Sequence, residues 1–332
     1  MLLVILGGCA EPGVEQSLVE ISGRTMGTYY ALKIRTERQV NVEALGGEVT
    51  QMLENLNQIF STYEPSAEIS RLNAAKSTDE QQISTRLWMM LALAKAFCQK
   101  SAGAFDVTLS PLVELWGFGS AERESIAEIE RRLASVRAKT GDALFSLPRR
   151  GIVVKSDKDV TLDLSAIAKG YAVDVLAQYL LAQGYEDYLV DIGGEIRAQG
   201  SNSRGKGWMV GIEKPVVGER RVGWRLPLQN QAMASSGDYR NYFEHAGKRY
   251  SHLIDPRDGY PIQIRDMTVT VVAEQASIAD GWATAMAVLG VERGLPLAEK
   301  EQLAVQFAFL DKTVRSTAFQ RLMAAVDDRQ SD

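Results

Sequence analysis

The chain has 332 residues, 45% of them hydrophobic and 24% charged, with a formal net charge of −5. This length favours one large domain or two, and the composition is that of a globular protein with enough apolar side chain for a large core. An acidic chain without a basic cluster is not expected to bind nucleic acid, and an anionic ligand would need a local positive field from a metal ion, a helix N-terminus or a few placed basic side chains.

The N-terminal stretch MLLVILGGCAEP has the pattern of a bacterial lipobox, in which small residues precede a cysteine that becomes lipidated. The apolar run Leu2–Leu6 is too short to span a bilayer, and it has no basic n-region, which leaves the start of the signal peptide open. Pro12 ends the apolar run directly after Cys9, which favours a lipobox over a buried strand with a chance cysteine. We expect residues 1–9 to be a signal remnant with lipid on Cys9, and residues 10–20 to be a linker.

The first half of the chain is predicted to be mainly helical. Residues 25–35 are predicted to form a strand, and residues 42–60 form a helix because apolar residues recur there at steps of three and four. Four segments follow, namely a loop at 61–75, a helix at 85–101, an irregular stretch at 103–119 and a charged surface helix at 122–139. Cys98 lies in the second helix and is expected to be a buried small hydrophobe without a disulfide partner.

The second half is predicted to alternate strands and helices. Residues 151–165 contain two β-branched runs around a polar turn, which predicts a hairpin, and a helix follows from about residue 166 with apolar residues at every fourth position. The remaining predicted elements are strands at 188–200, 208–215 and 266–274, a helix at 276–294 and a closing helix-strand-helix unit. Because tight hairpins join many of the strands, we predict an α+β fold rather than a doubly wound parallel sheet.

The segment TLDLSAIAKGYAVD is the first candidate for chemistry. Its predicted helix start offers free backbone N–H groups, which suit a phosphate, while Ala166 and Gly170 would let a ligand approach the backbone closely and Lys169 adds a positive charge. The alternative is an ordinary strand-to-helix junction, capped by Ser165 and carrying a solvated lysine. The segment is neither a Walker loop nor a G-x-G-x-x-G motif.

The segment ASIADGWATAMAVLG is the second candidate, because Asp280 and Thr284 stand four residues apart and share one helical face. A carboxylate and a hydroxyl are hard oxygen ligands, and Mg²⁺ is commonly held by one or two carboxylates together with substrate phosphates and water. The alternative is that Asp280 caps the helix and Thr284 packs inside it.

Two further candidates are Asp106, in GAFDVTLSPL, and His252, in YSHLIDPRDGYPI. Asp106 could bind ribose hydroxyls or a heterocycle N–H, or it could be an ordinary turn aspartate. His252 precedes Asp255 by three residues and could accept a proton near neutral pH, or it could be a hydrogen-bonded structural histidine. The only other histidine, His245, is expected at an exposed hairpin tip. The chain contains no G-x-S-x-G elbow and no H-E-x-x-H motif.

Taken together and in this order, eight segments resemble the ApbE family of flavin transferases. They span Thr25 to Gly290 and read TMGTYY, FSTYEPSAEISRLN, GAFDVTLSPL, LDLSAIAKGYAVD, YLVDIGGEIRAQG, MASSGDYRNYF, SHLIDPRDGYP and ASIADGWATAMAVLG. The resemblance implies a T-fold-related α+β domain over residues 21–328, with mixed sheets and packed helices in a single catalytic unit.

The resemblance also implies an activity, in which FMN is transferred from FAD to a threonine or serine hydroxyl of a target protein, with Mg²⁺ as cofactor and AMP as product. Two alternatives remain open at this point: an Mg²⁺-dependent FAD pyrophosphatase that gives FMN and AMP, and a non-enzymatic flavin-binding lipoprotein. The implied acceptors are flavin-carrying subunits of sodium-pumping NADH:quinone reductase or Rnf-type complexes. The lipobox fits the implied place, the periplasmic side of the inner membrane.

Residue by residue, the resemblance implies three groups of contacts. The FAD contacts would be Met26, Tyr63, Ala104, Phe105, Asp106, Asp163, Lys169 and Ile254. The cation would be held by Asp280 and Thr284, with backbone oxygens near Ala166 and Ala283. His252 is our hypothesis for the base that accepts the hydroxyl proton, with Asp255 orienting it or contacting the cation region.

Overall fold

The computed structural model describes residues 17–119, 123–216, 218, 221–239 and 241–328. Its centre is an eight-stranded sheet with the order β1-β2-β6-β7-β10-β13-β14-β15, in which neighbouring strands pair antiparallel. The strands are β1 (Ser17–Thr25), β2 (Thr28–Thr36), β6 (Asp187–Ile192), β7 (Glu195–Gln199), β10 (Gln231–Gly237), β13 (Thr268–Ala273), β14 (Ala304–Ala308) and β15 (Thr313–Arg315). An antiparallel sheet with separate helices confirms the predicted α+β class.

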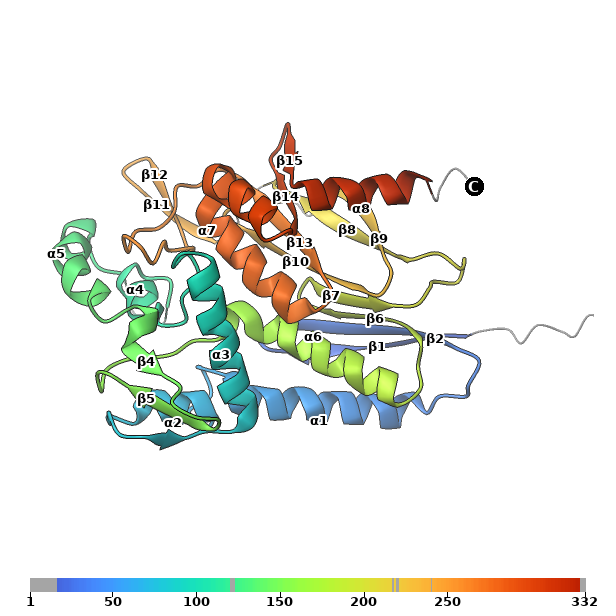
Figure 1. Ribbon diagram of the computed structural model, residues 1–332, viewed down its shortest axis with the longest axis horizontal. Helices are drawn as coiled ribbons and strands as arrows, with labels where there is room; N and C mark the ends of the chain where they lie inside the picture. The colour runs from blue at the N-terminus through green and yellow to red at the C-terminus, as the bar shows by residue number, and fades with distance from the viewer. Residues whose placement is uncertain (1–16, 120–122, 217, 219–220, 240, 329–332) are drawn as a thin grey trace, which may run out of the picture.

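One face of the sheet is covered by helices. Figure 1 shows α6 (Ser165–Ala182) and α7 (Ala276–Lys300) crossing in front of the sheet, with α1 (Val42–Phe60) and α3 (Thr85–Lys100) beside them. The large apolar core lies between these layers, and residues such as Val49, Leu176 and Val271 are fully buried there. At about 25 cal/mol per Å² of buried apolar surface, this layer provides the main stabilisation of the fold.

The opposite face carries a second, smaller core. The hairpin of β8 (Trp208–Lys214) and β9 (Arg221–Leu228) lies over it together with α8 (Thr317–Asp328). Strand alternation separates the two cores, because Ile196 and Ala198 of β7 belong to this smaller core while Glu195 and Arg197 face the helices. The direction in which β7 presents its charged residues is therefore set by the pleat of the strand.

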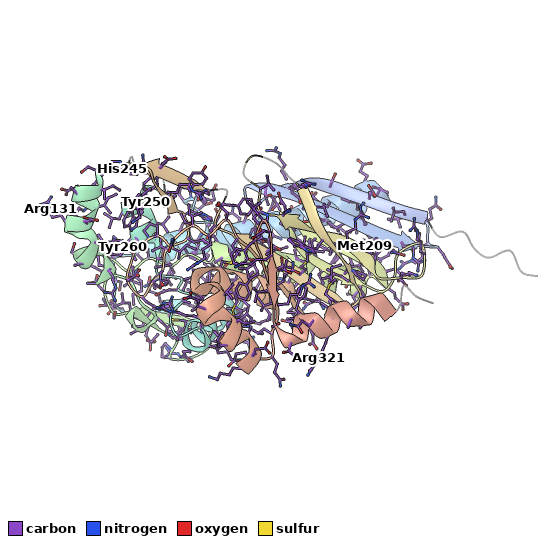
Figure 2. All side chains as sticks on the ribbon, turned by 90° about the horizontal axis from the view of Figure 1, so that it is seen from above. Arg131, Met209, His245, Tyr250, Tyr260 and Arg321 are labelled. Carbon is purple, nitrogen blue, oxygen red and sulfur yellow. The ribbon has the colours of Figure 1, made fainter. Side chains whose placement is uncertain are left out.

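A third cluster lies at one end of the molecule. It joins α4 (Ser110–Leu115) and α5 (Ile126–Arg137) to the hairpin of β11 (Tyr242–His245) and β12 (Lys248–Ser251) around the buried Trp116. Figure 2 shows Tyr250 and Tyr260 at this end of the molecule, with Met209 and Arg321 away from it. The short elements α2 (Glu68–Ala74), β3 (Gln81–Gln82), η1 (Asp142–Leu144), β4 (Phe145–Ser146) and β5 (Ile152–Lys155) complete the fold.

Several predicted elements need correction. The expected loop at 61–75 contains α2, and residues 17–20 of the expected linker at 10–20 belong to β1. The predicted hairpin at 151–165 is wrong, because β5 pairs with β3 and β4 rather than with residues 160–164. Ser165 does not cap α6: it is the first helical residue, and the N-cap position is Leu164, which offers no side-chain hydrogen bond.

Within the described residues, no helix combines the length and apolar character needed to cross a membrane. The lipidation predicted for Cys9 falls outside the described residues. Cys98 is a free cysteine, and burial together with the negative charges of Asp106 and Asp142 raises the pKa of its thiol to about 12. The thiol is therefore protonated and unreactive at neutral pH.

Candidate functional site

A cavity of about 790 Å³ opens between the β1–β2 turn, the end of α1 and the start of α6. Met26 and Gly27 form the turn, and both have positive φ (47° and 71°), as a two-residue hairpin turn of type I′ requires. Tyr63 lies at the edge of this cavity with 92% of its surface exposed. An exposed aromatic ring beside a cavity offers a flat surface on which a planar ligand can stack.

The strand-to-helix junction provides the polar wall of the cavity, with Asp163, Ser165 and Lys169 among its lining residues. Asp163 Oδ1 accepts a hydrogen bond of 2.8 Å from the backbone N–H of Ser165. The Ile167 and Ala168 N–H groups both donate to the Leu164 carbonyl at 2.9 Å, so the N–H of Ala166 is the one in the first turn that has no hydrogen bond among the described residues. This N–H and the nearby ammonium of Lys169 are the groups at the junction that could bind an anion.

Close packing of α6 against α7 brings the predicted cation ligand to this junction. A side chain at Gly170 would place its Cβ only 2.4 Å from the carbonyl oxygen of Ala276, so only glycine permits this approach. The backbone N–H of Gly170 donates to Asp280 Oδ2 at 3.0 Å. Asp280 is therefore not a helix cap: the residue is 3% exposed, and its carboxylate points at the first turns of α6.

Lys169, Asp280 and the buried Glu195 form a charge cluster. Lys169 Nζ lies 3.2 Å from Glu195 Oε1 and 3.9 Å from Asp280 Oδ1. Burial alone would lower the pKa of Lys169, but the charges of both carboxylates and the hydrogen bond to Glu195 raise it. Burial and the charge of Asp280 raise the pKa of Glu195 to about 8, and burial also raises the pKa of Asp280. Two buried carboxyl groups share one ammonium, so the cluster lacks a second positive charge.

A second ion pair between the same two elements is complete. Asp174 of α6 accepts hydrogen bonds from the backbone N–H groups of Ala276 and Ser277 at 2.9 Å, and from the Ser277 hydroxyl at 2.7 Å. Arg197 of β7 donates to the same carboxylate at 2.8 Å. Asp174 thus caps α7 from a neighbouring helix, which fixes the helix that carries Asp280.

The oxygen atoms around Asp280 fit a hard divalent cation. Thr284 lies one helical turn beyond Asp280, and its hydroxyl is 3.5 Å from the hydroxyl of Ser236 on β10. Glu195 Oε2 is buried with no hydrogen-bond partner among the described residues. Because the described residues contain no cluster of three or more His, Cys, Asp or Glu suited to a metal, a cation here would also need backbone or substrate oxygens, as Mg²⁺ commonly does.

The segment around Asp106 lies next to the same junction, because the backbone N–H of Asp163 donates to the carbonyl of Val107 at 2.7 Å. Asp106 accepts two hydrogen bonds from Thr108, which is turn geometry, and burial raises the pKa of its carboxyl. Ala104 and Phe105 are buried in the core, where Phe105 packs 5.3 Å from Phe97. Any contact of these two residues with a ligand would therefore be through their backbone.

His252 is half-buried at the end of β12, and its Nδ1 lies 2.9 Å from the carbonyl oxygen of Asn241. A carbonyl only accepts, so this contact requires Nδ1 to carry the proton and leaves Nε2 with the lone pair in the neutral ring. Burial lowers the pKa of His252 below 6.5, while the hydrogen bond to Asn241 and the charge of Asp238 raise it in part. His252 is thus neutral at pH 7, as a proton acceptor must be.

The expected role of Asp255 in orienting His252 is not what the geometry shows. Its carboxylate accepts hydrogen bonds from Arg257, including one of 2.7 Å from Nε, and these hold its pKa below the usual range although burial alone would raise it. The orienting partner of His252 is instead the Asn241 carbonyl. Ile254 is buried in the third cluster, and its side chain faces Trp116 and its neighbours rather than the cavity.

The structure brings together part of the predicted site. Met26, Tyr63, Asp163 and Lys169 line one cavity, and Lys169 links that cavity to Asp280. Among the described residues, no hydrogen bond or ion pair joins His252 to this cluster. Strand β10 lies near both: the Ser236 hydroxyl is 3.5 Å from that of Thr284, and the charge of Asp238, directly after β10, raises the pKa of His252 in part. Sequence reasoning missed Glu195 and Asp174, although inward-facing charges on a mostly apolar strand mark Glu195 and Arg197 as unusual.

Sequence and fold place the chain among the flavin transferases. The sequence model of the ApbE family matches residues 26–309. The chain is 42% identical to the FAD:protein FMN transferase of Vibrio cholerae over 91% of this chain and 90% of that protein, and 39% identical to the enzyme of the same name from Haemophilus influenzae over 93% and 92%.

Solved structures agree. The flavin transferase ApbE from Vibrio cholerae superposes with a TM-score of 0.84 at 38% identity, covering 92% of this chain and 99% of that one. The apo form of flavinyl transferase ApbE from Pseudomonas stutzeri gives 0.82 at 34% identity, covering 94% and 98%. The chain therefore belongs to the ApbE family.

Proposed function

We propose that this chain uses the cavity at the start of α6 to bind FAD and to transfer its FMN moiety to a hydroxyl of an acceptor protein. As a member of the ApbE family, the chain is an FAD:protein FMN transferase. The observation that carries the placement of the reaction is the Lys169–Glu195–Asp280 cluster, because it lies beside a large cavity and lacks the positive charge that a cation would supply.

The lining of the cavity supports one orientation of FAD. Tyr63 and Met26 would hold the isoalloxazine ring, since Tyr63 presents an exposed aromatic face and Met26 adapts to flat apolar surfaces. The pyrophosphate would lie at the start of α6, at the N–H of Ala166 and beside Lys169. The adenosine part would then extend towards Asp106 and the backbone of Ala104, Phe105 and Ile254.

A bound Mg²⁺ would be held by Asp280, Thr284 and backbone oxygens near Ala166 and Ala283, and it would neutralise phosphate charge that builds up during transfer. The residues of the chain bind and orient the substrate. Lys169 and the N–H of Ala166 orient the pyrophosphate, and Asp163 holds the first turn of that helix in place.

We assign the proton acceptor to Nε2 of His252. The acceptor hydroxyl oxygen forms a bond to the phosphorus of the FMN moiety, the bond from that phosphorus to the bridging oxygen breaks, and AMP leaves with that oxygen. The hydroxyl proton moves to His252 Nε2, whose lone pair is free because Nδ1 is engaged by Asn241. His252 makes no hydrogen bond or ion pair with the proposed cation ligands among the described residues, so the reacting phosphate and the acceptor hydroxyl would lie between them.

The test is to incubate the protein with FAD, Mg²⁺ and an acceptor protein that carries one threonine site, and to detect flavin fluorescence on the acceptor in a gel. We expect labelling by the wild type and none when the acceptor threonine is replaced by alanine. Release of AMP and free FMN without labelling would instead identify a pyrophosphatase. A flavin bound without any AMP release would identify a binding protein.

The chain offers a matched control for the base, because His245 is its only other histidine and lies on an exposed hairpin. We expect His252→Ala to lower the transfer rate by about 10²-fold or more, while His245→Ala leaves it unchanged. Full activity of His252→Ala with FAD still bound would contradict the assignment.

We further propose that Cys9 is lipidated and that the chain acts on the periplasmic side of the inner membrane. The small residues before Cys9 support this location, and acceptors there would include flavin-carrying subunits of sodium-pumping NADH:quinone reductase or Rnf-type complexes. Metabolic labelling with a clickable fatty acid tests it: Cys9→Ala should abolish incorporation of the label and release the protein from the membrane fraction.

A further inference from the structure

Glu195 is a buried carboxylate whose direction the fold sets strictly. It is the first residue of β7 and is 4% exposed. The preceding residues, Gly193 and Gly194, both have positive φ (64° and 105°), as a type I′ hairpin turn requires. This turn and the pleat of the strand point Glu195 at α6, on the same face of β7 as Arg197.

The contacts of Glu195 show an unequal sharing of one ammonium. Lys169 Nζ is 3.2 Å from Glu195 Oε1 but 3.9 Å from Asp280 Oδ1, so the shorter contact belongs to Glu195. The second oxygen, Oε2, is buried without a hydrogen-bond partner among the described residues. A buried, half-satisfied carboxylate is costly for stability, which suggests that its position serves the site rather than the fold.

We propose that Glu195 is a positioning residue that holds the ammonium of Lys169 away from Asp280. The arrangement keeps the carboxylate of Asp280 available to a divalent cation and keeps the charge of Lys169 at the wall of the FAD cavity. The inference deepens the function proposed above and rests on its placement of the cation at Asp280.

The physical reason is competition between two cations for one carboxylate. In a buried site the attraction between opposite charges is strong, so a Lys169 side chain without Glu195 would move the short distance to Asp280 and pair with it directly. A divalent cation would then have to displace the ammonium before it could bind. With Glu195 present, the ammonium already has a partner, and the cation meets a carboxylate that is only weakly paired.

The experiment measures Mn²⁺ binding by the electron paramagnetic resonance signal of free Mn²⁺, with the full chain and saturating FAD. Above the Glu195 pKa of about 8, where its carboxyl is ionised, we expect Glu195→Gln, which keeps the shape and removes the charge, to weaken Mn²⁺ affinity by about 10-fold, within the range of ligand-supporting residues in metal sites. Glu195→Asp keeps the charge and should lose less affinity than Glu195→Gln.

The double variant distinguishes competition from general damage. Lys169→Met removes the competing ammonium, so adding it to Glu195→Gln should restore Mn²⁺ affinity to that of Lys169→Met alone. A purely structural role for Glu195 would lower the melting temperature of Glu195→Gln without this rescue. Unchanged Mn²⁺ affinity in Glu195→Gln, or failure of Lys169→Met to restore it, would overturn the proposal.

Two controls separate this inference from the assignment on which it rests. Arg197→Met changes a charged residue on the same face of β7, and it should lower stability while leaving Mn²⁺ affinity unchanged. Asp280→Asn tests the cation site itself. If Asp280→Asn binds Mn²⁺ as the wild type does, the cation is not at Asp280; if Asp280→Asn loses binding while Glu195→Gln does not, only the role of Glu195 is wrong.

Discussion

Two ion pairs connect β7 to α6, and they differ in how completely their groups are satisfied. Arg197 and Asp174 form the complete pair, since the Asp174 carboxylate also accepts three hydrogen bonds from the start of α7. Glu195 and Lys169 form the incomplete pair, which shares its ammonium with Asp280 and leaves one carboxylate oxygen unpaired among the described residues.

The two pairs differ in what their buried charges contribute, one to the stability of the fold and the other to the site. Both pairs are drawn from the same two elements and lie on the same side of the sheet, so their composition and burial alone do not distinguish them. A complete pair stabilises the fold because every buried polar group has a partner. An incomplete pair that carries a raised carboxylate pKa beside a cavity indicates a site that a ligand completes.

Asp280→Asn changes the carboxylate that shares Lys169 with Glu195, and it should give the largest effect. Loss of the cation's carboxylate is expected to lower kcat/KM for flavin transfer by roughly 10²-fold or more, because metal stabilisation of phosphate charge provides several kcal/mol. The unfolding free energy in EDTA should stay the same or rise, because the variant removes a buried, underpaired charge. Transfer assays and urea unfolding in EDTA test both outcomes, and a strongly destabilised but fully active variant would contradict them.

Asp174→Asn should give the opposite result at the complete pair. It leaves Arg197 without its carboxylate and weakens the cap of α7, so the unfolding free energy should fall by about 3 kcal/mol. The Mn²⁺ affinity of the protein that remains folded should change little, because Asp174 does not face the cavity. Urea unfolding and Mn²⁺ binding at low temperature provide the measurements, and a large loss of affinity without loss of stability would show that the two pairs do not divide structure from function.

The sequence predicted elements whose signals are local. The helices at Val42–Phe60 and Ser165–Ala182 follow from apolar periodicity, and the buried strand at Thr268–Ala273 from its β-branched run. It failed for residues 160–164, where Val160, Leu162 and Leu164 alternate as in a strand. There the side chain of Asn73 makes both hydrogen bonds to the backbone of Leu162, in place of a strand partner.

The site could be predicted only in part for the same reason. Asp280 and Thr284 share a helical face, so their spacing is visible in the sequence, and the resemblance to the ApbE family added the cavity residues. Glu195 and Asp174 act through partners brought close by the packing of α6, α7 and β7, which no spacing rule encodes. His252 is oriented by the Asn241 carbonyl rather than by Asp255. Every residue carries a backbone carbonyl, so the sequence does not reveal which one makes this contact.

The pH dependence of stability should reveal the raised pKa of Glu195 in the incomplete pair. Its pKa is raised from 4.5 to about 8 by burial and by Asp280, so the folded chain binds a proton that the unfolded chain releases between these values. Stability therefore falls as pH rises from about 4.5 to about 8, and Glu195→Gln should remove this slope. We expect a relative change of about 1–3 kcal/mol by urea unfolding in EDTA; parallel pH profiles for the two proteins would contradict the raised pKa.

The smallest effect is expected from Gly194→Ala, which tests whether the turn before β7 positions Glu195. A Cβ at Gly194 meets no atom within 4 Å, so the substitution costs only the strain of φ 105°, about 1–2 kcal/mol. Gly247→Ala, on the β11–β12 hairpin, has φ 74° and equally open surroundings, and it provides a matched control for that strain. Both variants should lose similar stability, but only Gly194→Ala should weaken Mn²⁺ binding, by about two- to threefold, because only there does the displaced strand residue hold Lys169. Equal Mn²⁺ affinities in the two variants would show that the turn does not set the position of Glu195.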